Sequence, residues 1–426
     1  MENTDEQRPV ADGRLLRVLT GATLPDGRRV DVRLDHGAVT HVTDAAPCST
    51  TRAVERGVDT ADTADALDLD GYLLLPAPAE PHAHLDKAFS WNEIRPPMGD
   101  LGRAIDSWRE HSAHLTVDGI AVRARRAALA LLANGTTAVR SHVDLLPGPA
   151  PLRGVRALVR VREELADVMD VQLVALCPFD TPDEILDEAL DLGVDLVGGS
   201  PHHTPAPSSD LQRLLRIAER RGVGVDLHTD EQLNPDMLTL EELAKSVRDW
   251  PESMPVTAGH CVSLGTVDPD VLERTVRAVV DSRIGIVTLP ITNLYLQGWD
   301  HPVSTPRGLT AVRALLDAGV RVGAGADNVR DPFNPLGRSD ALETAMLLVT
   351  AAHLTTAEAY HAVSTGARAV MGLPEAGVFP GARADLLAVR AADLEEAIAD
   401  ASAERYVLRA GRLVSATHVH RSMYRA

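Results

Sequence analysis

Hydrophobic and polar positions follow two patterns along the chain, one near its ends and one in its middle. Near both ends, short apolar segments alternate with turns rich in Gly, Pro and Asp, which is typical of a small antiparallel sheet. The N-terminal segments are residues 15–19, 30–34, 38–42 and 66–69. After Gly377 the pattern returns, with segments 384–389 and 405–409 on either side of a helix-like stretch. We expect residues 1–72 and 376–426 to join into one satellite domain, a small β-sandwich.

The middle of the chain, residues 73–375, alternates apolar runs with amphipathic stretches at a spacing of roughly thirty residues, which indicates parallel strands linked by helices. The predicted strands are residues 73–75, 137–142, 171–176, 196–199, 224–228, 256–260, 285–289 and 321–325. The predicted helices include residues 117–133, 211–220, 238–249, 271–280 and 309–318. Eight such units favour a closed (β/α)8 TIM barrel over an open sheet. The irregular stretch 201–210 is a candidate loop over the pocket.

The length and charge of the chain limit the classes of molecule that it is expected to bind. The 426 residues suffice for a large barrel with a satellite. A formal net charge of -19 and a pI of about 5.2 argue against nucleic acid or an anionic membrane as partner, since both reward clustered Lys and Arg. A small-molecule substrate is therefore expected.

Cysteine usage and the start of the chain predict a cytoplasmic protein. The 3 cysteines, Cys48, Cys177 and Cys261, are too few and too scattered for a disulfide framework. The segment 1–7 lacks the basic head and apolar core of a signal peptide, and no later segment reaches membrane-spanning length. We therefore expect an unprocessed protein in a reducing compartment.

Two histidines at the end of the first apolar run are the strongest chemical signal. In the segment Glu80-Pro81-His82-Ala83-His84, the histidines are two residues apart, so at a strand's end they point the same way and can hold one metal ion. Four more candidate groups lie at the ends of other apolar runs: His228, Glu231, His260 and Asp327. Because the carboxyl ends of barrel strands share one rim, we expect these side chains to converge. Any one of these histidines alone would more often be a hydrogen-bonded core residue.

These residue types suit hydrolytic metal chemistry. The candidate ligands of the ion are His82, His84, His228 and Asp327. Imidazole nitrogens with one carboxylate suit Zn²⁺ or Fe²⁺ and leave a position for a water that the ion activates. Glu231, three residues after His228, is placed to shuttle a proton, although a surface glutamate at the next helix start is the alternative. His260 is a candidate to orient the nucleophile or polarise the attacked carbon, or else it packs under a loop.

Lysine is rare in this chain, which draws attention to Lys87. Of the 42 basic residues only Lys87 and Lys245 are lysines. Lys87 follows the histidine pair by three residues and is therefore a candidate substrate contact. A solvated loop lysine is the alternative interpretation.

Several segments together resemble a known family. They are residues 80–86, 139–144, 226–231, 293–298 and 325–337. With them the chain resembles the amidohydrolase superfamily over nearly its whole length, and most closely its cytosine deaminase branch. The resemblance implies one ion held by the four candidate ligands, Glu231 delivering a proton to a ring nitrogen, His260 as a further catalyst, and Asp327 accepting a proton from water. Binuclear relatives use a modified lysine on strand four, where this chain has none, and barrels of this superfamily often self-associate, so a homo-oligomer is possible.

Departures from the cytosine deaminases predict a different substrate. Those enzymes carry a glutamine just past strand three, where this chain has Cys177-Pro178-Phe179-Asp180. A buried substrate edge left unpaired costs ~1 to 3 kcal/mol, so cytosine should be discriminated against. Asn328 stands where they carry a second aspartate, and Lys87 replaces a neutral residue. We therefore expect a more positive pocket in which Lys87, Phe179 and Asn328 contact an anionic or oxygenated ring.

The leading functional hypothesis is hydrolytic deamination of a small nitrogen heterocycle other than plain cytosine. A second hypothesis keeps the metal chemistry but cleaves a cyclic amide, or releases a substituted amine as isopropylammelide amidohydrolases do. A third is a catalytically silent barrel that binds a ligand. Ammonia release separates the first two hypotheses, and metal analysis with a Glu231→Gln variant separates the third.

Overall fold

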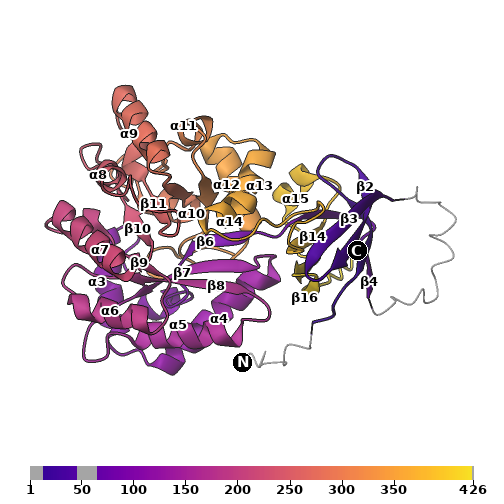
Figure 1. Cartoon of the computed structure of the whole chain (residues 1–426), viewed down its shortest axis with the longest axis horizontal. Helices are drawn as coiled ribbons and strands as arrows, with labels where there is room; N and C mark the ends of the chain where they lie inside the picture. Colours follow the sequence, from indigo (N-terminus) through magenta and orange to yellow (C-terminus); the bar gives the residue numbers. More distant parts are fainter. Residues whose placement is uncertain (1–12, 46–64, 425–426) are drawn as a thin grey trace. The chain divides into compact units, whose positions relative to one another are not determined.

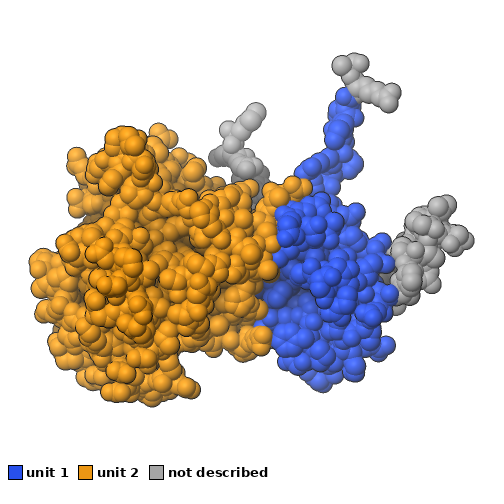
Figure 2. All heavy atoms as spheres, turned by 90° about the horizontal axis from the view of Figure 1, so that it is seen from above, with its two compact units in different colours: residues 1–77, 376–397, 402–426 blue, residues 78–375, 398–401 orange. Residues whose placement is uncertain are grey.

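The computed structural model describes residues 13–45 and 65–424. Cys48 and the segment 1–7 lie outside the described residues. The chain forms two compact units, which are coloured separately in Figure 2. The larger unit is residues 78–375 with 398–401, and the smaller takes residues up to 77, 376–397 and those from 402 onward.

The larger unit contains eight parallel strands, hydrogen-bonded to one another in their order along the chain. They are β6 (Ala79–Ala83), β7 (Ala138–Asp144), β8 (Asp170–Leu176), β9 (Leu196–Gly198), β10 (Val225–Thr229), β11 (Val256–His260), β12 (Gly285–Thr288) and β13 (Val322–Ala324). The ring closes just beyond β13, where Asp327 forms a parallel bridge with Ala83 and its N–H donates to the His82 carbonyl at 3.1 Å. The predicted (β/α)8 barrel is therefore confirmed.

Helices connect these strands and surround them, as Figure 1 shows. They are α2 (Trp91–Ile94), α3 (Leu101–Ser112), α4 (Val117–Ala133), α5 (Arg153–Glu164), α6 (Asp183–Asp191), η1 (Pro201–His203), α7 (Pro207–Arg221), α8 (Thr239–Ser246), η2 (Val262–Gly265), α9 (Pro269–Asp281), α10 (Pro290–Leu296), α11 (Val312–Asp317), α12 (Ala341–Ala352), α13 (Thr356–Val363) and α14 (Thr365–Val370). Helix α4 has the predicted bounds, and it starts where the Thr116 side chain accepts a hydrogen bond from the Gly119 N–H. Among the described helices, none has both the length and the hydropathy needed to cross a membrane.

The prediction that residues 73–75 form the first barrel strand is wrong. These residues belong to β5 (Tyr72–Pro76), which pairs antiparallel with β14 (Leu386–Arg390) in the smaller unit. A strand buried on both faces gives a continuous apolar run in a mixed sheet as well as in a barrel, so the pattern alone could not assign it. The first barrel strand is β6, in which polar site residues interrupt the apolar pattern.

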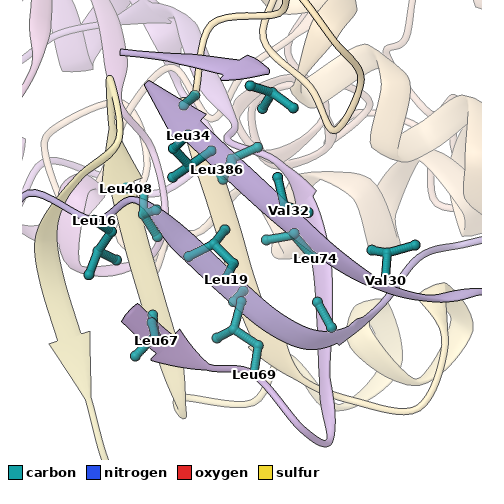
Figure 3. Packing of buried hydrophobic residues seen from close by; sticks show 14 of the residues in the cluster. Leu16, Leu19, Val30, Val32, Leu34, Leu67, Leu69, Leu74, Leu386 and Leu408 are labelled. Carbon is teal, nitrogen blue, oxygen red and sulfur yellow. The ribbon is translucent and has the colours of Figure 1, made fainter. Parts of the chain in front are cut away.

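The smaller unit is one mixed sheet formed from both ends of the chain. Besides β5 and β14 it contains β1 (Val18–Thr23), β2 (Arg29–Asp35), β3 (Ala38–Asp44), β4 (Ala66–Asp68), β15 (Arg405–Arg409) and β16 (Arg412–Thr417), and α15 (Leu394–Asp400) follows β14. Most pairings are antiparallel as predicted, but β1 pairs in parallel with β4 and β5. Figure 3 shows its apolar core, where Leu19, Leu74 and Leu408 come from different strands. The predicted satellite from both chain ends is confirmed.

A buried ion pair links several strands inside the barrel. The Arg140 guanidinium on β7 donates through Nη1 to Asp226 Oδ2 at 2.7 Å and to Thr257 Oγ1 at 3.1 Å, and through Nε to Gln172 Oε1 at 3.0 Å. The Arg140 and Asp226 side chains are 1% and 0% exposed. Burial opposes ionisation of Asp226, but the charges of His142 and Arg140 outweigh it and hold its pKa below the usual value.

Removing one partner of this pair should destabilise the barrel strongly. We expect Arg140→Ala to lower the free energy of unfolding by about 3–5 kcal/mol, because Asp226 would keep an uncompensated buried charge. The double variant Arg140→Met/Asp226→Leu should recover much of that loss. Urea denaturation of the purified variants measures both values. The control is Arg156→Ala, which removes an ion pair with Glu188 whose side chains are about half exposed and should change little. An Arg140→Ala protein as stable as the wild type would contradict this account.

Candidate metal centre

Four buried side chains come together at the rim where the barrel strands end. They are supplied by β6, by β10 and by the segments just after β6 and β13: His82, His84, His228 and Asp327. We call these four residues the donor cluster. Each is at most 6% exposed. The structure thus brings together the residues that the sequence analysis proposed as ligands, and their ligand role stays a prediction.

The donor atoms have the spacing that a small tetrahedral ion requires. His82 Nε2 and His84 Nε2 each lie 3.2 Å from His228 Nε2. Asp327 Oδ1 lies 3.2 Å from His84 Nε2 and 3.8 Å from His82 Nε2. Four ligand atoms held about 2.0–2.1 Å from a tetrahedral zinc ion lie about 3.3–3.4 Å from one another. The three histidines form one group whose ligand atoms all lie within 4.8 Å of one another, and Asp327 lies in a second such group with His82 and His260. The His228 distances and the distance from Asp327 to His84 therefore match such an ion.

The protonation states of the donor cluster also suit a cation. Burial, reinforced by neighbouring imidazoles or cations, lowers the pKa of its three histidines well below the usual value, so their rings are neutral. Burial, and then the Glu231 carboxylate, raises the pKa of Asp327 well above the usual value. Neither carboxylate oxygen of Asp327 has a hydrogen-bond partner within the described part of the chain. A bound cation would satisfy these buried oxygens.

Two glycines leave room for the side chains at this rim. A Cβ atom on Gly259 in β11 would lie 2.9 Å from His82 Cε1 and Nδ1. A Cβ atom on Gly325 would lie 2.0 Å from Glu80 Oε1. The Glu80 carboxylate accepts hydrogen bonds from the Ala326 N–H at 2.9 Å and the His82 N–H at 3.2 Å, so it ties the first and last strands together beside the donor cluster.

The backbone at this rim adopts an uncommon conformation at several non-glycine residues. Positive φ angles of 50°, 65°, 50° and 63° occur at Asp230, His260, Cys261 and Asp327. Each such residue costs on the order of 1–3 kcal/mol and persists only where its surroundings impose it, typically at functional sites. Two of these four residues, His260 and Asp327, are candidate catalytic residues, and the other two are their neighbours or neighbours of Glu231 in the chain.

Glu231 and His260 lie beside the donor cluster and have complementary protonation states. His260 Nδ1 lies 3.4 Å from Glu231 Oε1 and 3.1 Å from Asn293 Nδ2. Burial raises the pKa of Glu231 to about 8, whereas burial, then the charges of His142 and His203, lower the pKa of His260 to about 3. At neutral pH, Glu231 thus holds a proton and His260 is neutral. If the Asn293 amide donates to Nδ1, the imidazole proton is on Nε2, 3.9 Å from Asp327 Oδ2.

Known proteins with similar sequences and folds identify the family. The model of the amidohydrolase family matches residues 122–415. A pterin deaminase from Rhizobium rhizogenes is 33% identical over 372 residues, which cover 84% of each chain. The chain belongs to the amidohydrolase family. An N-isopropylammelide isopropyl amidohydrolase from Pseudomonas sp. (strain ADP) is 26% identical over 372 residues, 82% of this chain and 88% of the relative.

A solved structure extends the likeness to the whole fold of this amidohydrolase. The 5-methylcytosine deaminase from Klebsiella pneumoniae superposes with a TM-score of 0.83 and 28% identity, over 96% of this chain and 100% of that chain. The predicted place in the cytosine deaminase-like branch is confirmed. The chain is a metal-dependent hydrolase that acts on carbon–nitrogen bonds.

In this amidohydrolase the charge of Lys87 is balanced within the protein. Lys87 Nζ lies 2.9 Å from Asp144 Oδ2, and its side chain is only 3% exposed. Burial would lower its pKa, but Asp144 and Asp86 outweigh burial and raise the pKa to about 12. The expectation that Lys87 makes the pocket more positive is therefore not supported. A direct contact between Lys87 and substrate stays a prediction.

The other two predicted substrate contacts lie in different environments. Asn328 is buried beside Asp327, and its Nδ2 donates to Asp331 Oδ2 at 2.8 Å, so one of its donors is already used. Phe179 follows β8 and is 46% exposed, which leaves its ring free to lie against a flat ligand. Both contacts stay predictions.

His142 at the end of β7 is close to the donor cluster, although the sequence analysis assigned it no role. Its ring centroid lies 4.0 Å from that of His82, and its Nε2 lies 3.5 Å from Asp226 Oδ1. One signal was present, because Arg140 and His142 are two residues apart in a strand and so point to the same side. The sequence pattern alone could not show that this side of β7 faces the barrel interior, below the donor cluster.

Metal binding should release a proton from Asp327 at a higher pH than an ordinary carboxyl group would. Burial and the Glu231 carboxylate raise the pKa of Asp327, so the group keeps its proton to a higher pH than a carboxyl group with the usual pKa of 3.8, and a bound ion would displace that proton. Affinity for the ion should therefore fall as the pH is lowered. Zinc titration calorimetry in two buffers of different ionisation enthalpy measures the proton count, with Asp327→Asn as the control that should release none. An equal heat in both buffers for the wild type would contradict the protonated state.

Proposed function

We propose that this amidohydrolase holds one divalent ion, Zn²⁺ or alternatively Fe²⁺, in the donor cluster and deaminates an aminated, oxygenated nitrogen heterocycle of the pterin type. The observation that carries the proposal is that His228 Nε2 lies 3.2 Å from both His82 Nε2 and His84 Nε2, and that Asp327 Oδ1 lies 3.2 Å from His84 Nε2 and 3.8 Å from His82 Nε2. Glu231 and His260 lie next to these atoms. When bound there, the ion would supply Lewis acidity and lower the pKa of a water molecule. The donor set of nitrogens and one oxygen, without a strand-four lysine, supports one ion.

The residues around the cluster can move the protons that deamination needs. Water adds its oxygen to the ring carbon, the bond to the exocyclic nitrogen breaks, and ammonia leaves. One water proton ends on the ring nitrogen and the other on the departing amine. Glu231, protonated at neutral pH because burial raises its pKa to about 8, delivers the ring proton. Asp327 Oδ2 has no hydrogen-bond partner in the described structure and receives the proton of the attacking water.

His260 is placed to support the same step without changing its charge. Its pKa of about 3 keeps the ring neutral, so it donates one N–H and accepts one hydrogen bond. The Nε2 atom lies 3.9 Å from Asp327 Oδ2, which leaves room between them for an oxygen atom in contact with both. In this role His260 orients the attacking oxygen.

The pterin-type substrate is supported by the 33% identity to a pterin deaminase and by two features of the chain. The half-exposed Phe179 ring at the rim offers a flat apolar surface for a bicyclic ring. Position 177, just past strand three, is a buried cysteine and offers no amide edge to cytosine. The first feature suits a ring larger than a single pyrimidine, and the second disfavours cytosine itself.

Release of a substituted amine is a second candidate because of the 26% identity to an isopropylammelide hydrolase. The same cluster can hydrolyse either bond, and the leaving group distinguishes them. Ammonia from pterin supports the first function, and isopropylamine from N-isopropylammelide without ammonia from pterin would favour the second. A catalytically silent barrel is disfavoured by the intact donor cluster and the buried Glu231.

Two further proposals concern the cellular location of the protein and its oligomeric state. Cys177 and Cys261 are both buried and form no disulfide, which suits the proposed cytoplasmic location. Self-association is proposed from the family resemblance alone.

Replacing Glu231 by glutamine should abolish most of the activity without removing the metal. We expect kcat for ammonia release from pterin to fall about 10²- to 10⁴-fold, the usual contribution of a positioned proton donor. The zinc content should stay unchanged because Glu231 is outside the donor cluster. The matched control is Glu252→Gln, which makes the same chemical change at an exposed position. A fully active Glu231→Gln enzyme would exclude the proposed proton transfer.

A further inference from the structure

One buried histidine at the rim has no assigned partner. His202 lies in η1, directly after β9, and is only 5% exposed. Neither of its ring nitrogens has a hydrogen-bond partner among the described residues. Leaving a buried polar group unpaired costs on the order of 1–3 kcal/mol, so such groups normally meet a ligand or water. His202 belongs to the stretch 201–210, which was expected to be an irregular loop over the pocket; the structure instead forms η1 and the start of α7 there.

The surroundings of His202 place it in the candidate active site. One of its ring nitrogens lies within 4.8 Å of a Glu231 carboxylate oxygen and of a His203 ring nitrogen. The rings of His202 and His203 have their centroids 4.0 Å apart. The ring of His202 lies near the backbone of His228, but no hydrogen bond of acceptable geometry joins them. An imidazole whose two nitrogens are both unpaired can give a ligand one N–H donor and one acceptor.

A second metal ion bound by His202, His203 and Glu231 fits these distances poorly. No hydrogen bond joins His202 to His203 or Glu231, whose ligand atoms are only known to lie within 4.8 Å of one another, whereas His228 Nε2 lies 3.2 Å from both His82 Nε2 and His84 Nε2. His203 is also exposed. The separation between His202 and Glu231 instead leaves room for a ligand atom that both can contact.

We propose that His202 hydrogen-bonds the substrate, on the ring edge next to the nitrogen that Glu231 protonates. This inference rests on the proposed deaminase function and narrows its substrate class. A neutral imidazole can donate to a ring carbonyl or accept from a ring N–H, so the preferred heterocycle carries a lactam edge beside the attacked carbon. A heterocycle without a carbonyl or N–H group at this edge would leave His202 unpaired and would bind more weakly.

The test compares three variants on two substrates. His202→Phe keeps an aromatic ring but removes both nitrogens, and His202→Asn keeps one donor and one acceptor. His41→Phe is the control, because it makes the same change at an exposed position of β3 in the smaller unit. Each protein is assayed with pterin and with pterin methylated on its lactam nitrogen, and its zinc content and melting temperature are measured.

We expect His202→Phe to lower kcat/KM for pterin about tenfold or more, mainly through KM, and to lose the wild-type preference for pterin over the methylated compound. His202→Asn should retain much of that preference, and His41→Phe should resemble the wild type. All proteins should hold the same amount of zinc. A role confined to folding would lower the melting temperature without changing the preference.

Several outcomes would overturn the inference. An unchanged preference in His202→Phe would exclude the substrate contact, and so would two zinc ions in the wild type with one lost on this substitution. In both cases an active wild type would leave the proposed deaminase function in place. A wild-type enzyme that releases ammonia from neither compound would overturn both proposals together.

Discussion

The closure of the barrel between its first and last strands is the constraint on which the site depends. The bridge between Ala83 and Asp327 joins the two ends of the sheet, and the Asp327 N–H donates to the carbonyl of His82. Two donor-cluster residues are therefore brought together by the same backbone contacts that close the fold. The Glu80 carboxylate strengthens this seam from within the barrel. A change in the backbone contacts that close the barrel would therefore also move His82 and Asp327 relative to each other.

Burial away from water explains the protonation states of the side chains at the rim. Burial is the first cause of every large pKa shift there, lowering the pKa values of the histidines and raising those of Asp327 and Glu231. The rim therefore favours neutral histidines and uncharged carboxyl groups, so a cation that binds there competes with protons. Deeper in the barrel the opposite holds, because Arg140 and His142 keep Asp226 ionised. The same burial has different results depending on whether a counter-charge is present.

Two kinds of feature could be predicted from the sequence: elements that repeat along the chain, and polar residues that lie at the ends of strands. The strand–helix alternation identified the barrel, and polar residues after apolar runs identified the donor cluster, because all strand ends share one rim. Residues 73–75 were misassigned because a doubly buried strand has the same pattern in either sheet. The balanced charge of Lys87 could not be read from sequence, since Asp144 is distant in the chain and lies opposite it only after β7 pairs with β6. His202 was missed because a histidine in a loop has no periodic signal, and only burial without a partner distinguishes it.

The most direct test of the account is to locate the metal by anomalous diffraction at the zinc edge in crystals of the zinc-loaded protein. The account predicts one anomalous peak, about 2.0–2.1 Å from the Nε2 atoms of the three donor-cluster histidines and from Asp327 Oδ1. A peak between His142 and Asp226, a peak at His202 and His203, or no peak at the rim would contradict it.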